Sequence, residues 1–394
     1  MALSVSARAI PAGPGLLTVD LRALADNWRL LAKRARPAQC AAVVKANAYG
    51  TGIEEAGPAL WGAGARTFFV AQLAEGVTAR SVLPEEATIY VLDGLEPDAD
   101  PADYAEWRLK PAIGSSEELE RWAGFAERRG EIAPCALHID TGMRRLGFNT
   151  VGELEQAMAR HGALSGADLL ISHFVSAELP QDPINARQIA LFGAARAAFP
   201  DLPASLDNSS GLFLPMQPVH DLVRPGYALY GGNPTPGSPN PMRAVVTLTI
   251  PVQQTRWIEP GMTCGYNAQW AAKRQTRLAT LLVGYADGLP RWVGATDERP
   301  GAEIMIAGKR CPLVGRISMD LAIADVTELP EDAVRPGVRA EFFGGAVALD
   351  DFAARSGVIG YQLLTGLGPR YRRTYVGGPP PILSGPAARP NSPR

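Results

Sequence analysis

A lysine stands directly after a short apolar run near the N-terminus. Residues 41–44 are all apolar and predict a buried strand, and Lys45 follows at once, before Tyr49 and Gly50. Parallel strands of α/β folds carry active-site residues at their C-terminal ends. A lysine that is partly withdrawn from water there has a lowered pKa and can act as a nucleophile and a base. A lone strand-end lysine is more often a solvated surface residue, so the prediction depends on the rest of the chain.

Further polar stretches follow other strand-like runs. They are residues 138–148, 172–174, 208–211 and 224–227. Serine, glycine and exposed backbone N–H groups late in a barrel are typical of a phosphate site, and a lysine near such a site indicates pyridoxal phosphate. Each stretch has an ordinary alternative: a helix cap at 208–211, a core histidine at His173, a solvated loop at Arg145, or an ion pair of Arg224 with Asp221. Together they favour an active site.

The first half of the chain alternates between strand-like and helical patterns. Eight strand-like runs lie at residues 41–44, 67–70, 88–92, 109–113, 135–139, 168–172, 204–206 and 222–224. Helical patterns lie between several of them, and Asp20 and Ser115 are candidate N-caps. Strands that alternate with helices predict a parallel sheet, and eight of them can close a (β/α)8 barrel. An open doubly wound sheet is the alternative, weakened because no G-x-G-x-x-G follows the first strand.

The composition changes near residue 232, where a connector rich in Gly and Pro begins. Short strand-like runs dominate after it, so we expect an α/β barrel followed by a mostly-β domain. The 394 residues exceed the roughly 250–300 residues of one core. The expected divisions are residues 1–15 as an extension that could pack on the β domain, 16–232 as the barrel, 242–376 as the β domain, and 377–394 as a disordered tail.

Charge and cysteine usage exclude several classes. The net charge of −2 provides no basic stripe for nucleic acid. No apolar run approaches the roughly 20 residues of a membrane span, and the first 15 residues make a poor signal peptide. The four scattered cysteines are typical of reduced thiols in a cytoplasmic protein. The histidines lack metal-ligand spacing, so no metal site is expected.

Several motifs resemble those of one family in their order along the chain. VVKANAYGTG, HIDTGMRRLGF, SHF, DNSSG, VRPGYALYGG, CGYNAQW, VGYADGLPR and VGRISMDL are similar to the successive motifs of alanine racemase, over nearly the whole chain. The resemblance implies a pyridoxal-phosphate enzyme with a barrel and a β domain, working as a homodimer. It also implies interconversion of L- and D-alanine, which supplies D-alanine for bacterial peptidoglycan.

The resemblance assigns roles residue by residue. Lys45 matches the lysine that binds the cofactor covalently and serves as one base, and Tyr266 matches the second base on the opposite face. The matched cofactor contacts are Tyr49, His173, Ser209, Arg224, Gly226, Tyr227 and Tyr361. Substrate contacts match Arg145, Met319 and Asp320, and entrance residues match Glu178, Tyr285 and Arg291. In the family, Tyr266, Met319 and Asp320 reach the cofactor from the partner subunit.

Three positions depart from the family pattern. His138 stands where many members carry a carbamylated lysine that braces the arginine matched by Arg145, so a bound anion such as chloride or a direct contact would have to replace it. Thr51 stands where histidine is common, and Glu178 where aspartate is usual. None of these changes removes a catalytic group.

Other functions remain open on the sequence. A racemase of serine, lysine or a broad set of amino acids would share the fold and both bases. A non-catalytic pyridoxal-phosphate carrier would need neither Tyr266 nor Met319. A decarboxylase of this fold would place an acid, rather than Arg224, against the pyridine nitrogen.

Overall fold

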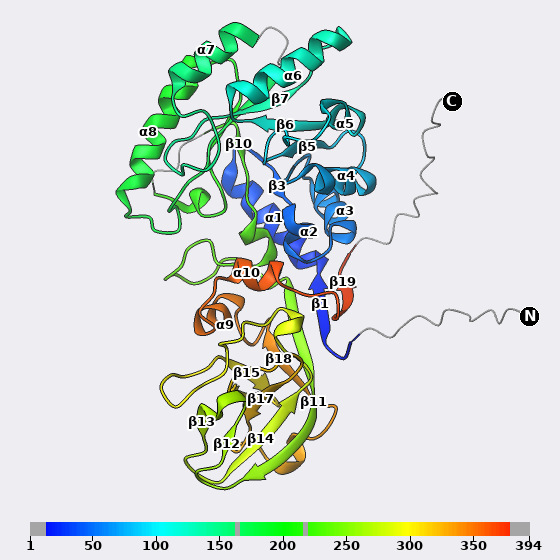
Figure 1. Cartoon of the computed structure of the whole chain (residues 1–394), viewed down its shortest axis with the longest axis vertical. Helices are drawn as coiled ribbons and strands as arrows, with labels where there is room; N and C mark the ends of the chain where they lie inside the picture. The colour runs from blue at the N-terminus through cyan, green and yellow to red at the C-terminus, as the bar shows by residue number, and fades with distance from the viewer. Residues whose placement is uncertain (1–12, 162–165, 216–219, 379–394) are drawn as a thin grey trace, which may run out of the picture.

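The computed structural model describes residues 13–161, 166–215 and 220–378. Most of the predicted N-terminal extension and C-terminal tail lies outside these residues. The chain forms two layered parts, a barrel of strands surrounded by helices and a β domain beneath it (Figure 1). No helix among the described residues is long and apolar enough to cross a membrane.

The N-terminal part is built on a seven-stranded parallel sheet in the order β3-β4-β5-β6-β7-β8-β9. These strands are β3 (Ala42–Val43), β4 (Thr67–Val70), β5 (Thr88–Val91), β6 (Leu109–Ile113), β7 (Cys135–His138), β8 (Ala167–Ile171) and β9 (Ala204–Ser205). An eighth strand, β10 (Leu222–Val223), pairs in parallel with β2 (Gln39–Cys40), which lies just before β3. Backbone bonds from Asp221 N to Ala204 O and from Val43 N to Pro225 O close the ring. The predicted barrel is confirmed.

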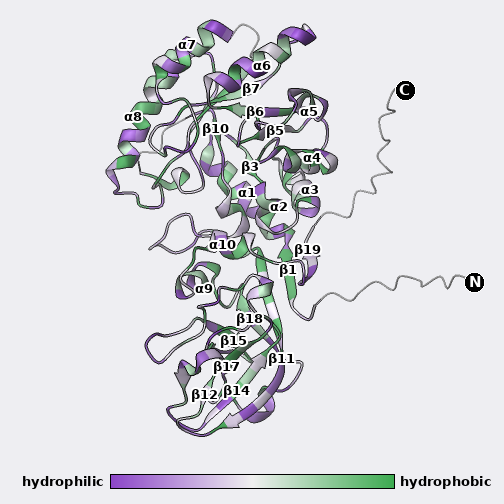
Figure 2. Cartoon of the chain, viewed as in Figure 1, coloured by the Kyte–Doolittle hydropathy of each residue, from purple (hydrophilic) through white to green (hydrophobic). Residues whose placement is uncertain are grey.

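Helices cover the outside of the barrel. They are α1 (Leu21–Ala35), α3 (Ile53–Ala63), α4 (Leu73–Val82), α5 (Pro101–Glu106), α6 (Ser116–Arg129), α7 (Val151–His161) and α8 (Pro183–Ala198). The cap signals in the sequence are confirmed, because Asp20 accepts from Ala23 N at 2.9 Å and Ser115 accepts from Glu118 N at 3.2 Å. Hydrophobic residues gather on the strands, while α6, α7 and α8 carry hydrophilic residues as well (Figure 2). That pattern is expected of amphipathic helices against a buried sheet.

Short helices follow some strands on the side where the predicted functional residues lie. They are α2 (Lys45–Tyr49) and the 3₁₀ helices η2 (Gly211–Phe213) and η3 (Tyr227–Tyr230). All three begin within a few residues of a strand's C-terminal end. They therefore belong to the face of the barrel that carries active sites in this architecture.

The β domain contains an eight-stranded sheet. Its strands are β1 (Leu16–Asp20), β11 (Val246–Ile258), β14 (Thr276–Leu281), β15 (Glu303–Ile306), β16 (Lys309–Pro312), β17 (Ala322–Asp325), β18 (Arg339–Phe343) and β19 (Arg372–Val376). A separate hairpin of β12 (Thr263–Cys264) and β13 (Trp270–Ala271) carries η4 (Tyr266–Ala268) at its tip, and the other short helices are η5 (Tyr285–Asp287), η6 (Glu331–Ala333), α9 (Leu349–Arg355) and α10 (Gly360–Thr365). The predicted mostly-β domain is confirmed.

The first strand belongs to the second domain's sheet. Residues 16–20, predicted to open the barrel, form β1, which pairs antiparallel with β11 and parallel with β19. Leu17 and Val19 alternate with more exposed neighbours and are fully buried, which suits a half-buried strand of a mixed sheet rather than a barrel strand. Just before β1, Gly13 N donates to Arg370 O, two residues before β19 begins. The β domain therefore holds both ends of the described chain.

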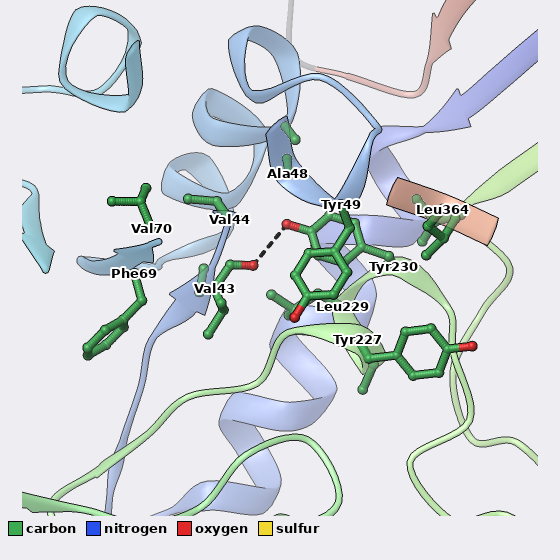
Figure 3. Close-up of a cluster of buried hydrophobic side chains, with 14 of the residues drawn as sticks. Val43, Val44, Ala48, Tyr49, Phe69, Val70, Tyr227, Leu229, Tyr230 and Leu364 are labelled. Atoms are coloured by element: carbon green, nitrogen blue, oxygen red, sulfur yellow. Dashed lines mark hydrogen bonds between the residues drawn. The ribbon is translucent and has the colours of Figure 1, made fainter. Parts of the chain in front are cut away.

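A continuous hydrophobic core joins the two domains near the end of β3. Tyr49 stacks on Tyr230 with ring centroids 4.6 Å apart, and Tyr227 stacks on Tyr361 at 3.9 Å. Tyr230 donates a hydrogen bond to Val43 O at 3.0 Å (Figure 3). Tyr361 lies on α10, so the β domain contributes a side chain to the C-terminal end of the barrel.

Candidate active site

A cavity of about 420 Å³ opens at the C-terminal ends of the barrel strands. Most of the sequence-predicted site residues line it: Lys45, Tyr49, Arg145, His173, Ser209, Arg224, Gly226, Tyr227 and Tyr361, together with His138, Asp93 and Asn208. Its size is in the range of a small-molecule or cofactor site. The fold thus brings together residues that are scattered over the whole chain.

Lys45 follows β3 and its side chain is half-buried. Burial lowers the pKa of the Lys45 amine, and the positive charge of Arg145 lowers it further, while Asp93 and Glu75 act in the opposite direction. Desolvation and a like charge both disfavour the ammonium form. The amine is therefore easier to deprotonate than an exposed lysine, as a nucleophile or a base requires.

The backbone after Lys45 is strained. Ala46, Asn47, Ala48 and Tyr49 all have φ near +53°, a left-handed turn that costs roughly 1–2 kcal/mol for each L-residue. Gly50 continues the turn at φ +77°, and a Cβ there would lie 2.2 Å from Leu364 O in α10. Only glycine fits this close approach. The strain persists because the surroundings hold the turn, and such strain is characteristic of functional sites.

One end of the cavity has the chemistry of a phosphate cradle. Ser209 Oγ accepts from Gly226 N at 3.0 Å and from Ala228 N at 3.2 Å, which leaves its O–H free to donate. A Cβ at Gly226 would lie 2.3 Å from the Tyr49 hydroxyl oxygen, so glycine is required for Tyr49 to reach this backbone. Among the described residues, the backbone N–H of Tyr227 has no hydrogen-bond partner. Hydroxyls and an unpaired N–H are the donors that a phosphate needs.

Arg224 lies at the centre of the barrel end with only 5% of its surface exposed. Its guanidinium donates to Ser205 O at 2.8 Å and to Ser172 O at 2.5 Å. Burial lowers the pKa of Arg224 to about 10, while Asp207 has an opposing effect. The side chain remains charged at neutral pH and is held rigidly, with N–H groups left over for a ligand.

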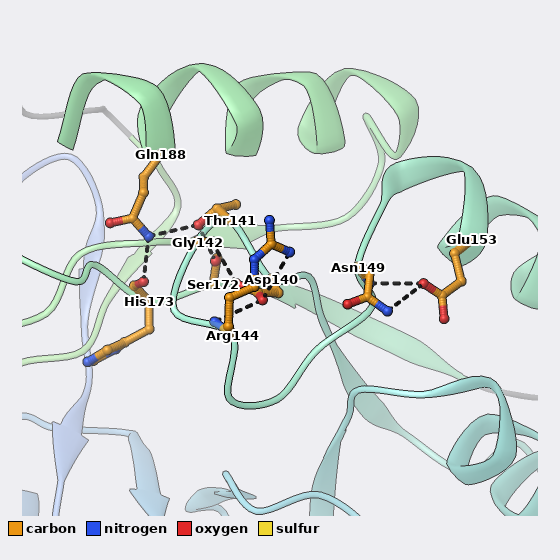
Figure 4. A network of polar contacts seen from close by, with 9 residues as sticks. All are labelled: Asp140, Thr141, Gly142, Arg144, Asn149, Glu153, Ser172, His173 and Gln188. Carbon is orange, nitrogen blue, oxygen red and sulfur yellow. Dashed lines mark hydrogen bonds and ion pairs between the residues drawn. The ribbon is translucent and has the colours of Figure 1, made fainter. Parts of the chain in front are cut away.

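Two histidines beside Arg224 are held in the neutral form. Burial, followed by the positive charges of Arg224 and Arg145, lowers the pKa of His173 well below its usual value and that of His138 to about 4. His173 O accepts from Gln188 Nε2 at 2.9 Å, and the same amide donates to Thr141 Oγ1 (Figure 4). His138 Nδ1 is buried and has no hydrogen-bond partner in the described part of the chain. A neutral imidazole can pack against a flat ligand without adding charge.

Arg145 is exposed on the loop after β7. The loop itself is anchored by Asp140, which accepts from Gly142 N at 2.6 Å and from Arg144 N at 3.0 Å (Figure 4). Within residues 13–161, 166–215 and 220–378, Arg145 has no hydrogen-bond or ion-pair partner. Its charge is therefore available to an anionic ligand.

The remaining predicted residues lie outside this cavity in their own chain. They are Tyr266, Met319 and Asp320, predicted to act from the partner subunit, and the entrance residues Glu178, Tyr285 and Arg291, and all six are exposed. Tyr266 is 60% exposed at the tip of the β12–β13 hairpin, and Met319 is 52% exposed. The Asp320 carboxylate pairs with Arg370 at 2.8 Å, so it is not free to bind a cation from a ligand.

Two acidic residues near Lys45 were not predicted. Asp93 lines the cavity after β5, and burial raises the pKa of its carboxyl while Lys45 opposes that effect. Asp93 directly follows the strand-like run at residues 88–92, and this position could have identified it as a candidate site residue. Glu75 lies in the first turn of α4, where an acidic residue is ordinary, so its sequence position carried no signal. No group of three His, Cys, Asp or Glu side chains that could hold a metal ion occurs among the described residues.

A closed barrel with a half-buried amine of lowered pKa, donors suited to a phosphate and a buried guanidinium at its C-terminal end is typical of an enzyme rather than a scaffold. Family models of the alanine racemase N-terminal and C-terminal domains match residues 19–234 and 245–375. An alanine racemase of Methylobacterium sp. (strain 4-46) is 56% identical over 362 residues, covering 91% of this chain and 97% of the relative. The chain belongs to the alanine racemase family.

Solved structures agree with this assignment. The alanine racemase from Bartonella henselae with covalently bound pyridoxal phosphate is 36% identical with a TM-score of 0.86, covering 93% of this chain and 100% of that one. The biosynthetic alanine racemase from Pseudomonas aeruginosa is 33% identical with a TM-score of 0.84, covering 92% and 99%. The resemblance found in the motifs is confirmed.

Proposed function

We propose that this protein interconverts L- and D-alanine with pyridoxal phosphate, using Lys45 and Tyr266 as bases on opposite faces of the substrate. The observation that carries the proposal is the position of Lys45: a partly desolvated amine at a strand end, in one cavity with a phosphate cradle and Arg224. D-alanine made in this way would supply peptidoglycan.

The cavity has donors suited to this cofactor. The Ser209 and Tyr49 hydroxyls and the Tyr227 N–H would hold the phosphate, with Gly226 allowing the close approach. Tyr361 would close the phosphate end from the β domain, since it stacks on Tyr227. His173, neutral because of burial, would lie against the ring. When bound covalently to the lysine, the cofactor supplies an electron sink for the substrate's α carbon.

The protein's own residues would then move the protons. Lys45 would take the α proton from one face, and Tyr266 of the partner subunit would return a proton to the other, because one base cannot easily serve both faces. Arg224 would face the ring nitrogen and keep its own proton, since guanidinium is deprotonated only with difficulty. Arg224 would therefore leave the ring nitrogen unprotonated and weaken the electron sink, which would limit side reactions. Arg145 would bind the substrate carboxylate.

The second base requires a homodimer. Tyr266 and Met319 are exposed and lie away from their own cavity, and large apolar side chains also remain exposed at Tyr285, Trp292 and Leu321. Apolar groups gathered on a surface indicate a protein interface. Met319 and Asp320 would contact the substrate carboxylate from the partner, Asp320 through its backbone, because its side chain pairs with Arg370. Glu178, Tyr285 and Arg291 would line the entrance.

A cytoplasmic location is part of the proposal. The four cysteines lie in the described part of the chain and form no disulfide there, and three of them are buried. Disulfides form and persist in oxidising compartments. Cysteines that form no disulfide therefore suit a reducing compartment.

The direct test uses the purified holoenzyme in deuterium oxide with L-alanine, L-serine and L-lysine in separate reactions. Rapid D-alanine formation with α-deuterium incorporation and slow conversion of the others is expected. Preference for serine or lysine would keep the two-base mechanism and change the substrate. Bound cofactor without exchange on any amino acid would contradict the racemase and favour a carrier. Full racemisation by Tyr266→Phe would show that the second base is misassigned.

A further inference from the structure

The strained turn after Lys45 is held by one carboxylate from the neighbouring βα unit. Glu75 Oε1 accepts from Ala46 N at 2.7 Å, and Glu75 Oε2 accepts from Ala71 N at 2.8 Å. Ala46 is the residue after Lys45 and the first with positive φ. Ala71 follows β4, the strand that pairs with β3. One side chain therefore ties the first residue of the left-handed turn to the end of the adjacent strand.

The β domain holds the other end of the same turn. Tyr375 donates to Thr51 O at 2.9 Å, and Arg373 donates to Gly50 O at 3.4 Å. Within the turn, Asn47 Oδ1 accepts from Ile53 N at 2.9 Å. These bonds fix the exit of the turn and leave its first peptide to Glu75. The direction in which the Lys45 side chain leaves the backbone thus depends on the bond at Ala46.

A second glutamate makes the same type of bridge farther round the barrel. Glu118 accepts from Gly114 N at 2.7 Å and from Leu95 N at 2.9 Å. The loops it joins follow β5 and β6, and Glu118 itself is absent from the cavity lining. Bridging two loops is therefore a structural device that recurs in this barrel, and Glu118 provides a matched reference. What distinguishes Glu75 is that its bridge ends beside the reactive lysine.

We propose that Glu75 is a positioning residue for Lys45: its carboxylate holds the left-handed turn that directs the amine into the cavity. The proposal rests on the proposed function, because it gives Lys45 the role of nucleophile and base. Glu75 acts through Lys45 and the backbone and does not itself line the cavity.

The charges around Lys45 give the direction of the effect. Arg145 and Arg224 lower the pKa of the Lys45 amine, in addition to burial, whereas Asp93 and Glu75 raise it. The tyrosines that line the cavity, Tyr49, Tyr227 and Tyr361, have pKa values raised by burial, and His173 is neutral. Removing the charge of Glu75 takes away one of the two carboxylates that raise the pKa of the Lys45 amine and leaves Asp93, so the pKa of the amine falls.

The test compares Glu75→Gln with Glu118→Gln in the full-length chain. The rate of covalent pyridoxal phosphate binding is followed across pH by the change in visible absorbance, because attack requires the neutral amine. For Glu75→Gln the midpoint should move to lower pH, because a charge that raises the pKa of the Lys45 amine is lost. The plateau rate should fall roughly tenfold, since one bond to a charged acceptor is lost. Glu118→Gln should change neither quantity.

Two further measurements separate position from charge and from folding. Glu75→Asp keeps the charge but shortens the reach, so its midpoint should stay near that of wild type while its plateau rate falls; this variant decides the question if Glu75→Gln does not fold. Amide hydrogen exchange at Ala46 should be faster by about tenfold in both Glu75 variants, a result that is independent of catalysis.

The outcomes distinguish the two proposals. Equal behaviour of Glu75→Gln and Glu118→Gln, or an unchanged plateau in Glu75→Asp, would overturn the role of Glu75 while wild-type racemisation stood. A wild-type holoenzyme without racemisation would instead refute the proposed function, and exchange at Ala46 would still report on the turn.

Discussion

Mixing two inactive variants tests whether each active site is shared between subunits. Lys45 lies in the cavity, whereas Tyr266 is 60% exposed on a hairpin that does not line it. Lys45→Ala removes the proposed nucleophile and first base, and Tyr266→Phe removes the proposed second base. Each substitution should lower the racemisation rate by about a hundredfold to a thousandfold, because a positioned acid or base typically contributes a rate factor of this size.

The expected activity of the mixture follows from the proposed sharing of the site. In a twofold dimer, a mixed pair would have one site with neither base and one site with both, because the Lys45 of one chain would meet the Tyr266 of the other. Random exchange of equal amounts makes roughly half of the dimers mixed, so the mixture should reach about a quarter of wild-type activity. If both bases came from one chain, every site in the mixture would lack one base, and activity would stay at the level of the separate variants.

The assay purifies the variants separately, exchanges subunits in mild denaturant and measures D-alanine formation after dilution. A mixture of Lys45→Ala with the double variant Lys45→Ala, Tyr266→Phe is the control, because no complete site can form in it. Activity in the test mixture no greater than in this control would refute the shared site.

Three further predictions concern stability, each measured by urea unfolding. Tyr227→Phe should cost about 1.5–3 kcal/mol, because it removes the hydroxyl that donates to Asp350 Oδ1 at 2.6 Å; an unchanged midpoint would mean that this bond between the domains contributes little. Gly50→Ala should destabilise the protein by more than about 1 kcal/mol, whereas Gly62→Ala should stabilise it by about 0.5–1 kcal/mol, because Gly50 has φ +77° and a backbone oxygen 2.2 Å from the added Cβ, while nothing lies within 4 Å at Gly62. Because folding lowers the pKa of His138 from 6.5 to about 4, the unfolded chain binds the extra proton between those values, and stability should fall by up to about 3 kcal/mol as pH drops through that range; His138→Gln should reduce this pH dependence, and an identical slope in the variant would contradict the assignment.

Much of the barrel was predictable because its signals are local. Apolar runs bounded by turn residues predict strands, and Asp20 and Ser115 begin their helices as N-caps. The position of β1 was not predictable in this way. Its alternating burial predicts a half-buried strand, but its partners are β11 and β19, and pairing over such sequence separation leaves no local trace. The predicted barrel, residues 16–232, therefore includes β1, which belongs to the sheet of the β domain.

Some of the candidate site residues likewise have a local sequence signal, and others do not. Lys45 and Arg224 were found because a charged residue directly after an apolar run is unusual and parallel strands bring such residues together. Asp93 follows a strand in the same manner and could have been included. Glu75 acts through two backbone N–H groups, a contact that only the folded chain reveals. Tyr266 is predicted from the family motif alone, since an exposed tyrosine on a hairpin has no chemical signature of its own.

The turn after Lys45 shows why local rules fail at this site. Alanine is the best former of right-handed helix, and of residues 46–49 only Asn47 tolerates the left-handed region readily. The sequence thus opposes the conformation that the fold imposes, and bonds from Glu75 on one side and from Tyr375 on the other must outweigh that cost. At the end of the turn Gly50 lies close to α10, where an added Cβ would be 2.2 Å from Leu364 O. The conflict between local preference and tertiary structure is concentrated directly after Lys45, where the proposed reaction would depend on the direction of one side chain.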